Sequence, residues 1–258
     1  MPPTDSDSQH LNVDQRKGPP TTVLSSAHSS DHISPWKHIC CHSLAKKFDA
    51  ECPYYSIGMW AEDYQDVVYS PNPSIKIPTG ITIIHTPGHT PDSLTWYDRD
   101  SRLICVGDSF YEASSKDTQE CEVERVIRAP IIFEERSHLV TWWRSLDKVL
   151  ELVKGENARF ASQHTGLGAP PRLAISASHV TTTFPDAEPF ILSIRRFMAR
   201  ILRREVPTTP LDSGILPFKD VMAYEDGPEV APSKDFEWIV WAPKRIIEEG
   251  INGLAGEY

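Results

Sequence analysis

The sequence predicts an α/β fold, in which sheets of short strands are covered by amphipathic helices. Strand patterns with turn signals dominate residues 74–108, and helical periodicity dominates after residue 137. With 258 residues, 40% of them hydrophobic, the chain is large enough for one substantial core. We expect a single domain over residues 23–258. Residues 1–22 are Ser, Asp, Gln and Pro with little to bury, which predicts a disordered leader.

The first half of the domain is predicted to contain a four-stranded meander. Its strands are SIKI, GITIIHT, DSLTWYD and SRLICVGD, and the turn signals around them are Pro-Gly, Pro-Asp and Asp-Arg-Asp. A short apolar step at Val23-Leu24 precedes them. Residues 36–48, rich in Lys and His, are predicted to form a helix.

Two later segments show the periodicity of amphipathic helices. Residues 137–154 and 186–204 each place apolar side chains three and four positions apart, and Asp186 is a plausible N-cap of the second. RLAISAS between them predicts a buried strand. The late segment DFEWIVWA predicts another strand, followed by a last helix from Pro243.

Charge and composition exclude several partners. The chain has 26 Lys and Arg against 36 Asp and Glu, a formal net charge of −10, whereas nucleic-acid affinity depends on basic side chains. No apolar run reaches the eighteen or so residues of a membrane span, and no signal peptide is visible. The five cysteines lack zinc-finger or CxxC spacing, as expected of reduced thiols. These features favour a cytoplasmic protein that contacts neither nucleic acid nor membrane.

Histidine and aspartate stand at the ends of predicted strands or beside loops in three places. These are Asp31-His32, His89 within HTPGHTPDS, and Asp108 within ICVGDSF. Pro87-Gly88 predicts a tight turn that swings His89 out of the line of its strand. Imidazole and carboxylate groups together are ligands for zinc, and with more oxygen for iron or manganese. The three places are therefore candidate metal-ligating segments.

The order and spacing of these residues resemble the metallo-β-lactamase superfamily, whose members are αββα sandwiches. The resemblance covers roughly residues 22–204 and is most specific in TPGHTPDSL and in the strand that ends in GD. It implies that His89 binds a first metal ion and that Asp108 bridges two. It also implies that Asp31 and His32 bind the second ion.

The chain departs from the family pattern at the start of the first metal-binding loop. In VLSSAHSSDHIS, Ala27 and Ser29 stand where the family has its first two histidines. With one residue inserted, His28 can instead take the place of the second. Either alignment lacks at least one ligand of the first metal. In addition, only about twenty polar residues precede this loop. Two alternatives therefore remain: a complete sandwich, and a sandwich that lacks part of its first sheet.

Two histidines compete to be the last metal ligand of the family pattern. His164 lies in ARFASQHTGLG, directly after a helix, and His179 lies in RLAISASHVTT, at the end of a predicted strand. We favour His179, because the order strand, His, turn and helix is closer to the family.

The resemblance implies a metal-dependent hydrolase that uses a metal-bound hydroxide on a small molecule of the ester, thioester or lactone class. One or two Zn²⁺ ions are the expected cofactor, with iron or manganese as alternatives, and about one ion per chain is expected because the first site is incomplete. Asp31 is the candidate catalytic residue, orienting the hydroxide and handling its proton. The alternative is a catalytically degenerate member of the same fold that acts as a binding or interaction module.

Overall fold

The computed structural model describes residues 23–26, 57–72, 74–114, 128–179, 181, 183–211, 216, 218–226 and 236–258. The predicted leader, the predicted helix over residues 36–48 and the loop with His28, Asp31 and His32 lie outside the described residues.

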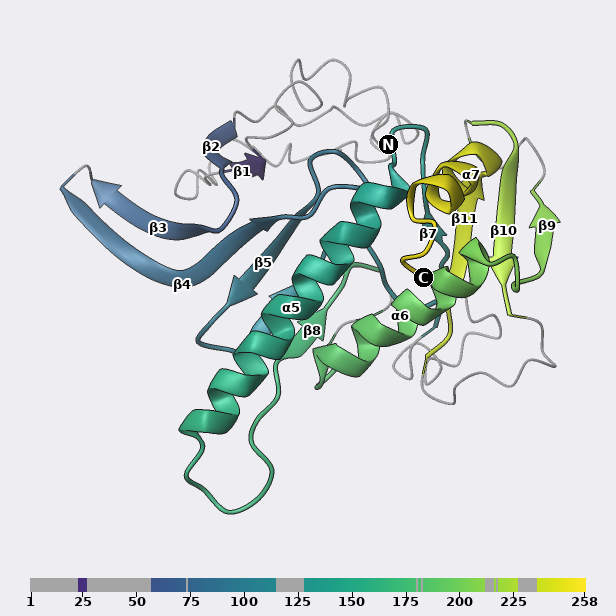
Figure 1. Ribbon diagram of the computed structural model, residues 1–258. Helices are drawn as coiled ribbons and strands as arrows, with labels where there is room; N and C mark the ends of the chain where they lie inside the picture. The colour runs from purple at the N-terminus through teal and green to yellow at the C-terminus, as the bar shows by residue number, and fades with distance from the viewer. Residues whose placement is uncertain are drawn as a thin grey trace, which may run out of the picture.

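The largest sheet has five strands in the order β3-β4-β5-β6-β8 (Figure 1). Pairing is antiparallel from β3 to β6 and parallel between β6 and β8. The strands are β3 (Gln65–Asn72), β4 (Ile75–His85), β5 (Leu94–Asp98), β6 (Leu103–Cys105) and β8 (Ala174–Ser176). The predicted meander is present with three strands, β4, β5 and β6, and not the four predicted. The predicted strand in RLAISAS is β8, whereas β3 was not predicted.

The segments SIKI and GITIIHT form one strand, β4, where the sequence predicted two. Pro78 and Thr79 do not end the strand, because the Thr79 hydroxyl donates a hydrogen bond to the Val67 carbonyl of β3 at 2.7 Å. Gly80 has a φ of +77°, and the β3–β4 pairing is irregular between Asp66 and Val68. The chain therefore bends within a continuous ladder, as β-bulges allow.

A second sheet has four strands in the order β7-β11-β10-β9. Its strands are β7 (Ile131–Ile132), β9 (Thr208–Pro210), β10 (Val221–Glu225) and β11 (Ile239–Pro243). Of these, only β11 was predicted. A separate parallel pair joins β1 (Val23–Ser26), at the predicted apolar step, to β2 (Ile57–Ala61).

Three helices complete the described part of the fold: α5 (Leu139–Gln163), α6 (Ala187–Leu202) and α7 (Lys244–Gly253). Asp186 caps α6 as predicted, since its side chain accepts a hydrogen bond from the Glu188 amide. The predicted helix after Pro243 is α7. None of the helices in the described ranges is long and apolar enough to cross a membrane.

Helix α5 continues to Gln163, well beyond the predicted end at residue 154. Asn157 and Phe160 extend its buried stripe by two further positions. The Asn157 side-chain carbonyl also accepts a hydrogen bond from the Leu173 amide at 2.8 Å, which ties the helix to the segment entering β8. Contacts from a distant part of the sequence therefore add the last turns.

One hydrophobic core joins the two larger sheets and the three helices. It includes residues from both sheets and from each helix, among them Ile84, Ile104, Ile175, Ile131, Val240, Leu139, Phe190 and Ile246. In Figure 1, α5 and α6 lie side by side, with the five-stranded sheet near α5 and the four-stranded sheet near α7. This mixed α/β architecture confirms the predicted fold class.

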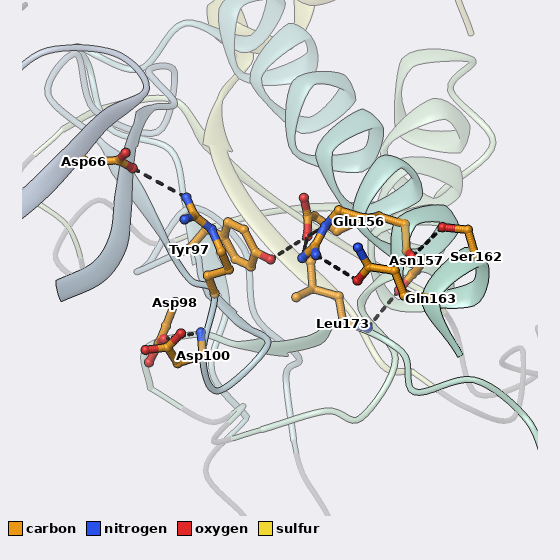
Figure 2. A network of polar contacts seen from close by, with 11 residues as sticks. Asp66, Tyr97, Asp98, Asp100, Glu156, Asn157, Ser162, Gln163 and Leu173 are labelled. Carbon is orange, nitrogen blue, oxygen red and sulfur yellow. Dashed lines mark hydrogen bonds and ion pairs between the residues drawn. The ribbon is translucent and has the colours of Figure 1, made fainter. Parts of the chain in front are cut away.

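A polar contact links β5 to the C-terminal half of α5. The Tyr97 hydroxyl donates a hydrogen bond to Glu156 Oε2 at 2.6 Å, and the two side chains point toward one another in Figure 2. Burial, together with this carboxylate, raises the pKa of Tyr97 to about 12 from its ordinary value of 10.0. A raised pKa means that the neutral phenol stabilises the folded state below pH 10.0, and that this stabilisation disappears as the pH passes 12.

Replacing Tyr97 with phenylalanine is expected to lower the free energy of unfolding by about 1.5–3 kcal/mol at pH 7, because a hydrogen bond to a charged group is lost. Urea unfolding at pH 7, 9 and 11 measures the difference between wild type and variant. The difference should be constant from pH 7 to 9 and shrink above pH 10. Tyr258→Phe is the control, since the Tyr258 hydroxyl has no hydrogen-bond partner among the described residues. A Tyr97→Phe difference as small as that of the control would show that the contact contributes nothing.

Candidate metal centre

His89 and Asp108 lie together at one edge of the five-stranded sheet. Strands β4 and β6 both pair antiparallel with β5, so they run in the same direction and their carboxyl ends meet at the same edge. His89 follows β4 and Asp108 follows β6. The His89 Nε2 atom lies 3.4 Å from Asp108 Oδ2.

Two hydrogen bonds from the residues just before α5 hold the loop that carries His89. The Ser137 hydroxyl donates to the His89 carbonyl at 2.6 Å, and the His138 amide donates to the Gly88 carbonyl at 2.8 Å. Gly88 has a φ of +132°, a conformation that favours glycine, and its amide donates to the Thr90 carbonyl at 3.0 Å. The predicted tight turn is therefore present. Only 8% of His89 is exposed.

Helix α5 also holds the loop that carries Asp108 in place. The Trp142 ring nitrogen donates to the Ser109 carbonyl at 2.9 Å, and Gly107 has a φ of +60°. The Asp108 side chain is 54% exposed. The hydrogen bond from His89 lowers the pKa of Asp108 below its ordinary value and outweighs the opposite effect of burial. Asp108 is therefore a carboxylate at neutral pH, within reach of a solute.

His179 reaches the same edge because β8 runs parallel to β6. The Ser178 amide donates to the Gly107 carbonyl at 2.8 Å, which joins the His179 loop to the Asp108 loop. A positive charge on His179 also contributes to the lowered pKa of Asp108. The backbone of His179 has a φ of +68°, which is uncommon for a residue with a side chain.

His164 lies elsewhere. It follows the last residue of α5, whereas the His89 loop contacts the first turn of this 25-residue helix. At 1.5 Å per residue, about 37 Å separates the two ends of such a helix. Of the two histidines that competed in the sequence, the structure thus brings His179 to Asp108 and leaves His164 far from it.

Tyr111 is a neighbour of the site that was not among the predicted metal ligands or catalytic residues. Its ring centroid lies 4.6 Å from that of His179, and its hydroxyl donates to the Pro130 carbonyl at 2.5 Å. Burial, and secondarily the charge of Asp108, raises its pKa to about 12. In the sequence it belongs to an aromatic pair, Phe110-Tyr111, that is typical of core packing. Its position three residues after Asp108 was the one signal available.

The side chains gathered here are of the kind that a metal ion requires. Two imidazoles and one carboxylate suit zinc, iron or manganese. The buried Nδ1 atom of His89 has no hydrogen-bond partner in the described structure, so this nitrogen is not committed to another hydrogen bond. However, no group of three or more His, Cys, Asp or Glu side chains in the described ranges is arranged to hold an ion by itself. The donor chemistry fits, and the described residues supply only part of a coordination sphere.

The sequence of this region matches a known family. Residues 77–164 match the model of the metallo-beta-lactamase superfamily, a segment that contains the loops of both His89 and Asp108. The match covers about a third of the chain, so over this segment the chain is similar to that superfamily. No curated protein matches the chain.

Three solved structures illustrate how distant the similar folds are. The protein TTHA1623, in a di-iron-bound form, is 13% identical, with a TM-score of 0.39 over 66% of this chain and 62% of its own. The metallo-beta-lactamase family protein TTHA1429 from Thermus thermophilus is 13% identical, with a TM-score of 0.42 over 72% and 55%. The archaeal superfamily protein ST1585 from Sulfolobus tokodaii is 12% identical, with a TM-score of 0.35 over 69% and 58%. This chain therefore spans less than two thirds of the length of each.

Proposed function

We propose that the chain is a metal-dependent hydrolase of a small molecule of the ester, thioester or lactone class. The observation that carries the proposal is the 3.4 Å approach of His89 to Asp108, with His179 beside them, at the sheet edge inside or next to the family-matched segment. His89, Asp108 and His179 would hold the metal. Asp31 and His32, which lie outside the described residues, would complete its coordination.

A bound zinc, iron or manganese ion would polarise the substrate carbonyl and lower the pKa of a coordinated water. The protein side chains have separate tasks. Asp108 presents a carboxylate at neutral pH on the solvent side of the site. His89 is buried and held through its backbone on both sides, so its ring has little freedom to move. Tyr111 packs against the ring of His179. Asp31 would orient the attacking water and accept its proton.

The net charge of the chain argues against a nucleic-acid substrate. A chain with a formal net charge of −10 repels a polyanion such as nucleic acid, so a small molecule is favoured over a nucleic-acid phosphodiester. Because at least one ligand of the first metal is replaced in the sequence, we expect about one ion per chain and not two.

Replacing Asp108 with asparagine is expected to lower metal affinity and turnover by at least about 100-fold, since even outer partners of metal ligands contribute 10–100-fold. Elemental analysis after loading with zinc or iron measures the metal content. A panel with one small ester, one thioester and one lactone measures turnover.

Asp100→Asn is the matched control, because it makes the same change on the β5–β6 turn, at the opposite end of β6 from Asp108. Equal metal content and turnover in wild type and Asp108→Asn would refute the proposed role of Asp108. Metal uptake by the wild type without turnover of any of the three substrates would instead support a binding module that retains the fold.

A further inference from the structure

A second polar site lies at the other edge of the five-stranded sheet. An open cavity of about 370 Å³ is lined by residues of the β5–β6 turn, of the last turns of α5 and of the loop that follows α5. Arg102, directly before β6, lines this cavity, and Asp108 follows the far end of β6. At about 3.3 Å per residue, the two residues are up to about 20 Å apart along the strand. The cavity is therefore separate from the candidate metal centre.

Three arginines line this cavity, which we call the arginine cavity, and no carboxylate does. Arg99 and Arg102 come from the β5–β6 turn, and Arg159 comes from α5. The chain as a whole carries ten more acidic than basic side chains. A cavity wall with arginines alone as its charged groups thus runs against the overall charge of the protein.

Arg159 is held in place by neighbours on its own helix. Its Nε and one terminal nitrogen donate to Glu156 Oε2 at 2.9 and 2.5 Å. Its other terminal nitrogen donates to Gln163 Oε1 at 3.2 Å. Figure 2 draws Glu156 and Gln163 as sticks on this part of α5. Much of the charge of Arg159 is therefore already neutralised by Glu156.

Arg102 and Arg99 are less committed. Arg102 forms no ion pair with any residue in the described ranges, and its guanidinium lies 5.3 Å from the centre of the Phe160 ring. Arg99 lies 3.7 Å from Asp66, but both side chains are more than half exposed, so this pair contributes little. Two guanidinium groups thus remain available to a ligand.

Phe160 and His164 shape the rest of the wall. The guanidinium groups of Arg102 and Arg159 both pack on the Phe160 ring, at 5.3 and 4.7 Å from its centre, and these contacts help to orient them. His164, the histidine that is not at the metal centre, lines the same cavity, and its Nε2 atom is buried without a hydrogen-bond partner in the described structure.

We propose that the arginine cavity binds a small molecule that bears phosphate or carboxylate groups, with Arg102 and Arg99 as its principal contacts. The planar guanidinium fork matches the oxygens of both groups and can donate two parallel hydrogen bonds. The volume is within the range of small-ligand sites. The proposal is independent of the hydrolase function. The opposing explanation is that the arginines only neutralise the partial negative charge at the carboxyl end of α5, which predicts no ligand.

Calorimetric titration of the full chain with inorganic phosphate, and separately with citrate, at constant ionic strength tests the proposal. The wild type should bind at least one of the two probes. Arg102→Gln should weaken that binding by about tenfold or more, as expected when a charge-assisted hydrogen bond is lost, and the Arg99→Gln/Arg102→Gln double variant should abolish it. Arg196→Gln removes the same charge from an exposed arginine of α6 that does not line the cavity, and should bind as the wild type does.

A stronger response to phosphate would assign a phosphate-bearing ligand, and a stronger response to citrate a polycarboxylate. Both results support the site, provided that Arg102→Gln and Arg196→Gln differ. Absence of binding of both probes to the wild type would overturn the proposal. Equal weakening by Arg102→Gln and Arg196→Gln would also overturn it, because it would show a general effect of charge.

Discussion

Replacing Gly88 with alanine is expected to disrupt the His89 loop and to destabilise the whole fold. A Cβ atom at position 88 would lie 2.3 Å from the backbone nitrogen and Cα of Trp142, and the φ of +132° is one that alanine rarely adopts. Trp142 belongs to the first turn of α5 and is 1% exposed, so its backbone cannot move away without disturbing the core. We expect a loss of more than about 4 kcal/mol in the free energy of unfolding. Urea unfolding followed by circular dichroism measures it.

Gly155→Ala is the matched control for this substitution. Gly155 lies within α5, and a Cβ there would meet nothing within 4 Å. Alanine in a helix interior stabilises relative to glycine by about 0.5–1 kcal/mol, so this variant should be slightly more stable than the wild type. If Gly88→Ala unfolded at the same urea concentration as the wild type, the close packing of this loop against α5 would be wrong.

The position of the candidate site could be predicted because it depends on local signals and on one simple rule of topology. Pro87-Gly88 encodes the turn before His89, and the apolar strand that ends at Gly107 encodes the position of Asp108. Once β4, β5 and β6 form a meander, strands β4 and β6 must end at the same edge. The approach of His89 to Asp108 follows from these features.

Other parts of the structure depend on partners that are distant in sequence. Strand β7 has only two residues and exists because it pairs with β11, about a hundred residues later. All three residues of β9 are exposed, so no apolar pattern marks it. The end of α5 depends on the hydrogen bond between Asn157 and Leu173. Pairing of this kind leaves little trace in a single sequence, because short or edge strands lack a hydrophobic period of their own.

Removing the side chain of Trp142 is expected to loosen both loops of the candidate metal centre. Its ring nitrogen holds the carbonyl next to Asp108, and its backbone packs under Gly88, next to His89. The ring also makes edge contacts with Phe133 and Phe110, at centroid distances of 5.5 and 6.4 Å. Trp142→Ala should therefore cost about 3–5 kcal/mol in the free energy of unfolding, the range for truncating a large buried side chain.

A milder pair of variants separates positioning of the loop from general stability. Trp142→Phe keeps an aromatic ring but leaves the Ser109 carbonyl without its donor, at a cost of about 1–3 kcal/mol beyond the loss of volume. Trp143→Phe makes the same change at the next position, where the side chain is also fully buried but its ring nitrogen has no hydrogen-bond partner in the described structure. Metal titration of the folded variants should show weaker binding for Trp142→Phe and nearly unchanged binding for Trp143→Phe. Equal metal affinities would mean that the bond from Trp142 to Ser109 does not position Asp108, and that the loop holds its shape through its own backbone.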